Sequence, residues 1–251
     1  MYPYIYIVLP SYSVMAFIGG FSAIIFLYLR LGKYEILFSE FIKILALCVI
    51  GCYAGSKLLF AITQISWLIS NFSIVNLLLL IPTSGFVFYG GLFGAITVLV
   101  LYTKNDLKLR KRLFHLATPA FPLFHGFGRI GCFLAGCCYG KELTQTITLF
   151  GIFSIDRIPV QLIESAFEFF LFSVLLFADH KNNVDDLLRV YLISYAVFRF
   201  FIEFLRGDEL RGFLFGISTS QWISIAIIVY YFTRMLLRSK EKKHPINKAE
   251  V

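Results

Sequence analysis

Four polar side chains recur along the apolar stretch 188–205 and just beyond it. Tyr195, Arg199 and Glu203 are four residues apart, and Arg206 follows three further on. On an α-helix these side chains fall within roughly 80° of one face. Ionisable groups at membrane depth are costly unless they face a partner or a wet interior. The stripe therefore indicates a functional polar site within the membrane or, alternatively, a structural Arg199–Glu203 pair that closes a helix bundle.

A second candidate lies in the glycine-rich segment 125–141, HGFGRIGCFLAGCCYGK. Its Arg129 is the only Asp, Glu, Lys or Arg in the apolar stretch 113–138. Glycines let backbone approach a ligand closely, and a guanidinium suits a phosphate. His125 lies one turn earlier, on the same face if the backbone is helical. An isolated histidine is more often structural, but beside Arg129 it becomes a candidate catalytic group.

A third candidate is the segment 157–168, RIPVQLIESAFE. Pro159 is well placed to begin a helix, and Gln161, Glu164 and Glu168 then share one face. The helix dipole favours a carboxylate near the N-terminus and partly explains Glu164. Glu168 lies deeper in the span and therefore requires a partner.

Two further segments contain candidate site residues, on weaker grounds. Gly90 and Gly91 lie in GFVFYGGLFG, which suits either ligand approach or close helix packing. Tyr12 lies at an expected membrane interface, where tyrosine is common.

The five cysteines indicate neither a disulfide framework nor a metal site. Cys132, Cys137 and Cys138 have the spacing C-x4-CC without a downstream fourth ligand, which is unlike zinc motifs. Adjacent cysteines strain a disulfide, and buried cysteine often fills apolar space. We therefore expect no metal and no cofactor.

The elements that must position these residues are membrane helices. The 251 residues are 59% hydrophobic and only 15% charged, too few charges for a soluble surface. We expect an all-α polytopic fold of about seven transmembrane helices, with residues 1–238 as a single transmembrane domain and 239–251 as a basic cytoplasmic tail. The expected spans are 11–30, 42–65, 85–102, 113–138, 161–178, 188–205 and 219–237. Prolines and glycines in 113–138 predict irregular backbone that lines a cavity.

Lysine and arginine predict the orientation. Loop 103–112 carries five basic residues, whereas 66–84 carries no charge. The positive-inside rule then places the N-terminus outside and the C-terminus in the cytoplasm. The net charge of +8 gathers in these short loops and the tail rather than on one face, so we expect no nucleic-acid partner.

Several segments together resemble one family. GRIGCFLAGCCYG resembles the signature of bacterial prolipoprotein diacylglyceryl transferases, roughly G-R-x-G-N-F-x-N-x-E-x-x-G, and keeps Gly128, Arg129, Gly131, Phe133 and Gly140. The blocks SYSVM, FYGGLFG, RIPVQLIES, YAVFRFFIEFLR and STSQWIS resemble further family elements in the same order. Together they reach from residue 11 to residue 224.

The resemblance implies a seven-span enzyme of the bacterial plasma (inner) membrane with its active site toward the outer face. Its expected partners are phosphatidylglycerol, membrane lipid and the lipobox segment of a prolipoprotein signal peptide, whose cysteine thiol receives the diacylglyceryl group. The expected catalytic residues are His125, Arg129, Arg199 and Glu203. The expected substrate-binding residues are Tyr12, Tyr89, Gly90, Gly91, Gly128, Gly140, Gln161, Glu164, Tyr195 and Arg206.

The sequence departs from the family pattern at four positions. Tyr89 replaces the histidine before Gly-Gly, and Cys132, Ala135 and Cys137 replace two asparagines and an acidic residue. Tyrosine is a weak base, so His125 is our candidate for that role. The alternatives are a related phospholipid-dependent transferase with a different acceptor, and a non-enzymatic lipid-binding or transport protein.

Overall fold

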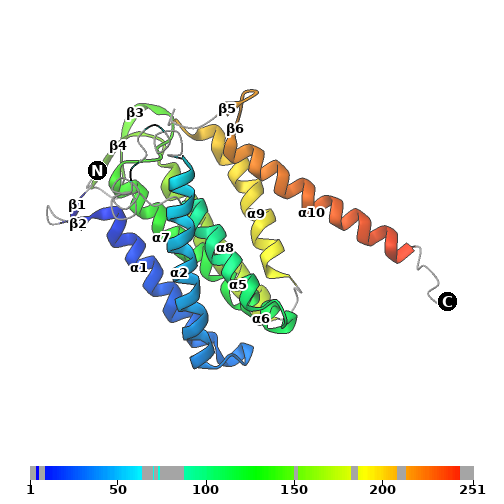
Figure 1. Cartoon of the computed structure of the whole chain (residues 1–251). Coiled ribbons are helices and arrows are strands. Elements are labelled where there is room, and N and C mark those ends of the chain that lie inside the picture. The colour runs from blue at the N-terminus through cyan, green and yellow to red at the C-terminus, as the bar shows by residue number, and fades with distance from the viewer. Residues whose placement is uncertain are drawn as a thin grey trace, which may run out of the picture. The chain divides into compact units, whose positions relative to one another are not determined.

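The structure, a computed structural model of the chain, describes residues 4–5, 9–63, 70, 73, 88–149, 152–181, 186–207 and 213–243. These residues are mainly helical (Figure 1) and belong to two compact units. The first unit comprises Met1–Leu27 and Ala117–Val251, and the second comprises Tyr28–Leu116. The expected single domain 1–238 with a tail at 239–251 stays a prediction.

Helices dominate the first unit. They are α1 (Ser11–Arg30, which enters this unit as far as Leu27), α7 (Ala120–Ala135), α8 (Val160–His180), α9 (Leu187–Ile202), the 3-10 turn η2 (Glu203–Leu205) and α10 (Thr219–Lys243). Along the chain, α7 packs on α8, α8 on α9 and α9 on α10. Leu171, Leu175 and Leu187 form a buried cluster between α8 and α9.

Glycines explain how closely α7 approaches its neighbours. A Cβ on Gly126 would lie 2.9 Å from Cζ of Phe169 on α8, and Ser165 Oγ donates to the Gly126 carbonyl at 2.9 Å. On another face, a Cβ on Gly131 would lie 3.1 Å from Cβ of Met15 on α1. Small residues at such positions let membrane helices approach each other.

Segment 113–138 differs from the expectation of one irregular span. The α6 helix ends at Ala117, and α7 runs without interruption from Ala120 to Ala135. Pro122 is accommodated because it lies in the first turn, where backbone N–H groups have no helical acceptor. The irregular backbone is confined to Thr118–Pro119 and to the turn after Ala135.

Three small antiparallel hairpins were missed by the all-α prediction. They are β1–β2 (Tyr4–Ile5, Leu9–Pro10), β3–β4 (Glu142–Leu149, Phe153–Arg157) and β5–β6 (Phe213–Leu214, Ile217–Ser218). The largest, β3–β4, joins α7 to α8 and pairs Glu142 with Arg157 across the strands. Arg157 Nη2 lies 2.7 Å from Glu142 Oε1, and such opposite-charge pairs help to fix register.

The second unit contains the 3-10 turn η1 (Gly32–Tyr34), α2 (Phe38–Thr63), α5 (Phe88–Tyr102) and α6 (Leu107–Ala117). Two glycine pairs four residues apart bring α2 and α5 together. A Cβ on Gly55 would lie 2.2 Å from the Gly90 carbonyl oxygen, and one on Gly94 would lie 2.0 Å from the Gly51 carbonyl oxygen. The packing alternative for the Gly90 segment is thus confirmed.

Among the described residues, four helices are long and apolar enough to cross a membrane. They cover Ser11–Arg30, Phe38–Ile62, Val160–His180 and Thr219–Leu237. Gly90–Tyr102 is a shorter apolar helix. The chain is therefore a mainly helical multi-pass membrane protein. The uncharged segment 66–84 lies outside the described residues, except Ser70 and Ser73.

Candidate active site

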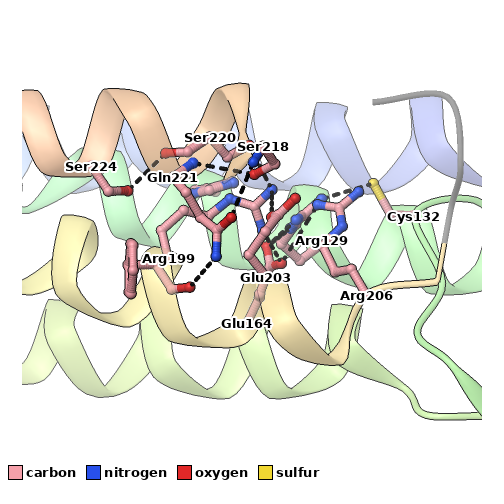
Figure 2. A network of polar contacts seen from close by, with 12 residues as sticks. Arg129, Cys132, Glu164, Arg199, Glu203, Arg206, Ser218, Ser220, Gln221 and Ser224 are labelled. Carbon is pink, nitrogen blue, oxygen red and sulfur yellow. Dashed lines mark hydrogen bonds and ion pairs between the residues drawn. The ribbon is translucent and has the colours of Figure 1, made fainter. Parts of the chain in front are cut away.

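Glu164 lies at the centre of a buried ion-pair network in the first unit (Figure 2). Arg129 of α7 donates to Glu164 Oε2 through Nε and Nη2. Arg199 of α9 places Nη1 2.9 Å from Oε1 of the same carboxylate. Arg206, which follows η2, places Nη1 3.8 Å from that oxygen. Glu164 is fully buried, and each arginine is at most 9% exposed.

Glu203, the first residue of η2 after α9, extends the network. Its Oε2 lies 2.8 Å from Nη2 of Arg199, so the Arg199–Glu203 pair considered from the sequence is present. It does not act alone, because Arg199 also binds Glu164. Three guanidinium groups thus face two carboxylates, and this network carries one excess positive charge. Such an excess suits a phosphodiester monoanion.

Arg206 reaches Glu164 because α9 ends before it. The helix stops at Ile202, η2 follows, and Arg206 itself is extended (φ −76°, ψ 144°). Lys141 N–H donates to the Leu205 carbonyl at 2.9 Å, and Gly207 N–H donates to the Tyr139 carbonyl at 3.1 Å. Backbone pairing with residues 139–141 therefore fixes the position of Arg206.

Gly140 explains this close backbone approach. A Cβ there would lie 2.5 Å from the Ile158 carbonyl oxygen and 2.9 Å from the Leu205 carbonyl oxygen. Gly140 was expected in substrate binding, but its contacts are those of a packing residue. It holds the segments that carry Arg206 and the start of α8.

The start of α10 supports Arg199. Ser218 Oγ accepts from Gln221 N–H at 3.3 Å, and Gln221 Oε1 accepts from Ser218 N–H at 3.1 Å. This reciprocal arrangement is a capping box. It positions Ser220, whose Oγ accepts from Arg199 Nη2 at 3.1 Å (Figure 2). Sequence reasoning missed Ser220, although STSQ before an apolar run is a capping-box signal.

His125 forms a second pair one turn from Arg129. Its Nδ1 lies 2.7 Å from Oε1 of Glu168, which is fully buried. The partner that Glu168 required is thus His125. His125 and Arg129 are one helical turn apart on α7, and Glu164 and Glu168 are one turn apart on α8. Because the two helices pack side by side, His125 contacts Glu168 and Arg129 contacts Glu164. With Glu168 ionised, its carboxylate only accepts hydrogen bonds. His125 would then donate through Nδ1, and Nε2 of the neutral imidazole would be left to accept a proton.

The other predicted residues of the first unit surround this network. The Tyr195 ring contacts His125 edge to face, with ring centroids 5.5 Å apart. Gln161 Nε2 donates to the Cys137 carbonyl at 2.7 Å. Tyr12 lies against Gly131, where a Cβ would be 3.2 Å from the Tyr12 Cα. Gly128 differs, because a Cβ there would meet no atom of the described residues within 4 Å.

Three predicted residues belong to the second unit. Gly90 and Gly91 are buried against α2, with a Cβ on Gly91 placed 2.7 Å from Ser56 Oγ. Packing accounts for both glycines. Tyr89 lies in α5, and its side chain is outside the described part of the chain.

A family model described as prolipoprotein diacylglyceryl transferase matches residues 4–237. The chain belongs to this family. It is 36% identical over 226 residues to a phosphatidylglycerol–prolipoprotein diacylglyceryl transferase of Clostridium tetani, covering 87% of this chain and 89% of the relative. A second transferase of the same name, from Clostridium perfringens, is 38% identical over 193 residues and 73% of each chain. One from Campylobacter hominis is 29% identical over 224 residues, 85% of this chain and 79% of the relative.

Proposed function

We propose that the chain transfers the diacylglyceryl group of phosphatidylglycerol to the lipobox cysteine of prolipoproteins, the first step of lipoprotein maturation. The observation that carries this function is the family match over nearly the whole chain. The buried network around Glu164 supports it, because phosphatidylglycerol is a phosphodiester with one negative charge and the network has one positive charge in excess.

The chemistry begins with the acceptor thiol. Its proton passes to Nε2 of His125, and the thiolate attacks the glyceryl carbon that bears the phosphate oxygen. A carbon–sulfur bond forms while the carbon–oxygen bond breaks, and the electron pair leaves on the oxygen of glycerol phosphate. Glu168 holds the imidazole in the required tautomer and stabilises the imidazolium that forms. His125 thus assumes the role of base that Tyr89 is poorly suited to fill.

The arginines act on the leaving group. As the carbon–oxygen bond breaks, the phosphate gains a second negative charge, and donors already fixed in place stabilise that charge without reorganisation. A guanidinium has five N–H donors, so Arg129, Arg199 and Arg206 can bind Glu164 and a phosphate together. Glu164 and Glu203 are positioning residues that hold the guanidinium groups beside one another.

The function is tested by transfer in proteoliposomes. With phosphatidylglycerol and a lipobox peptide, Arg129→Ala is expected to slow glycerol phosphate release by about 100-fold, the typical cost of one such donor. Release by the wild type should require the peptide and yield a thioether-linked lipopeptide, detected by mass spectrometry. Arg157→Ala removes an arginine from the exposed pair with Glu142 and should retain most of the activity.

The outcomes separate the candidate functions. Release that needs Arg129 but not the peptide would favour a phospholipid-dependent transferase with another acceptor. No release, beside an active family enzyme as control, would favour a lipid-binding or transport role.

We further propose seven spans, with the N-terminus outside and the site toward the outer face of the plasma membrane. Basic residues gather in 103–112 and in the tail, which are on one side in a seven-span chain. A C-terminal fusion to a protein that fluoresces only when folded in the cytoplasm should fluoresce. A dark but full-length fusion would contradict this orientation.

A further inference from the structure

The end of α7 gathers three cysteines. The Sγ atoms of Cys132, Cys137 and Cys138 all lie within 4.8 Å of one another. The helix explains the first two: Gly136 follows the last turn with φ 75°, and Cys137 N–H donates to the Cys132 carbonyl at 3.1 Å. This is the Schellman ending, in which the residues five apart bring their side chains together.

The Cys138 side chain comes close to the other two cysteines although its residue has an uncommon backbone conformation. Cys138 has φ 56°, one of three non-glycine residues with positive φ in the described part of the chain. Such a conformation costs of order 1 kcal/mol or more and persists where the surroundings determine it. Gln161 contributes here, because its Nε2 donates to the Cys137 carbonyl at 2.7 Å and ties the turn to α8. The thiols are thus held by a braced turn.

The thiols are close enough to share one ion, because their Sγ atoms all lie within 4.8 Å of one another. Ligands on a tetrahedral zinc at about 2.3 Å place their sulfurs about 3.8 Å apart. The three side chains also differ in exposure: Cys132 is buried, Cys138 is half-buried and Cys137 is exposed. An ion can therefore enter from the Cys137 side and keep one coordination position for solvent.

We propose that Cys132, Cys137 and Cys138 form a binding site for a thiophilic divalent cation of the zinc class. Binding converts three thiols to thiolates and releases their protons to solvent. Three thiolates and one divalent ion together carry a single negative charge.

The site is adjacent to the guanidinium network. Nη1 of Arg129 lies 3.9 Å from Sγ of Cys132 (Figure 2). A negatively charged metal–thiolate group would compete with phosphate for this guanidinium. If the proposed transfer function holds, the bound cation therefore weakens phosphatidylglycerol binding and slows transfer.

Cadmium is the probe for the site, because its thiolate complexes absorb strongly in the ultraviolet through charge transfer. The full-length protein in detergent, reduced and stripped with a chelator, should bind one Cd²⁺ and develop this absorption. Cys137→Ser should lower the Cd²⁺ affinity by more than about 100-fold, since even an indirect partner of a metal site is worth 10- to 100-fold. The matched control is Cys48→Ser/Cys52→Ser, which removes two thiols of the second unit.

Two results would overturn the proposal. One is absorption that survives Cys137→Ser, Cys138→Ser and Cys132→Ser but disappears in the Cys48/Cys52 control. The other is a reduced protein that binds no Cd²⁺ while the air-oxidised protein is two hydrogens lighter, which would identify a disulfide pair instead. Neither readout depends on catalysis, so both remain informative if the proposed function fails.

The effect on transfer is a separate measurement. In active protein, Cd²⁺ should raise the KM for phosphatidylglycerol at least about 10-fold, and Cys137→Ser should remove that inhibition while keeping the metal-free rate. Cd²⁺ binding without any change in the KM for phosphatidylglycerol would support the metal site but contradict its proposed effect on Arg129.

Discussion

Glu164→Gln is expected to lower the kcat of diacylglyceryl transfer by at least about 1,000-fold. Arg129 of α7, Arg199 of α9 and Arg206 after η2 converge on this one carboxylate. The amide keeps the shape of the side chain but removes its charge, so three guanidinium groups would share a single carboxylate, Glu203. Removing one partner of a buried ion pair typically costs about 3–5 kcal/mol. The arginines would move apart and lose the arrangement that stabilises the leaving phosphate.

The kinetic pattern distinguishes this positioning role from loss of folding. The KM for phosphatidylglycerol should not rise, because the extra positive charge still attracts the phosphate, while kcat falls. Glu164→Asp, which restores the charge on a shorter side chain, should recover part of the rate. A variant whose folded fraction falls but whose remaining molecules keep the wild-type kcat would contradict the role.

Glu142→Gln is the matched control. It also removes one carboxylate from an arginine pair, but the Glu142 side chain is 75% exposed. Exposed ion pairs are typically worth no more than about 1 kcal/mol. Its kcat and thermal midpoint should therefore stay close to those of the wild type. Equal losses in the two variants would mean that the network around Glu164 has no special function.

The sequence predicted which site residues share a helix face better than it predicted the contacts between segments far apart in the chain. Helical spacing placed Gln161 with Glu164, and both lie on α8. It also placed Arg199 with Glu203, which form an ion pair although Glu203 lies in η2, directly after the end of α9. The spacing of Arg206 extended that pattern beyond the point where α9 ends. Its contact with Glu164 depends instead on backbone pairing around Gly140, which links residues far apart in sequence. Periodicity carries no information about such pairing.

Two missed features had local signals. The segment TQTITL within β3 alternates threonine with other residues and is rich in β-branched side chains, which favours a strand. Gly136 after the apolar run 120–135 marks a helix end, and that ending brings Cys132 to Cys137. The metal motif was judged from linear spacing, which does not include the reversal of the chain at this glycine.

His125→Gln should lower the transfer rate at neutral pH by about 100- to 10,000-fold, the usual contribution of a general base. The geometric reason is the 2.7 Å contact of His125 Nδ1 with Glu168, which leaves Nε2 to accept the thiol proton. Glutamine can keep a hydrogen bond to Glu168 but cannot take up that proton. Glu168→Gln keeps the imidazole without its carboxylate and should lose less. His180→Gln, at the end of α8, should change little.

The dependence on pH separates a base from a structural histidine. In His125→Gln no imidazole can take up the thiol proton, so the rate should rise only as the peptide thiol ionises unaided, near its ordinary pKa of about 8.5. The loss of rate in His125→Gln relative to the wild type should therefore shrink above that pH, because a preformed thiolate needs no base. A deficit that stays constant across the pH range would assign His125 to packing and leave the proton acceptor to another group.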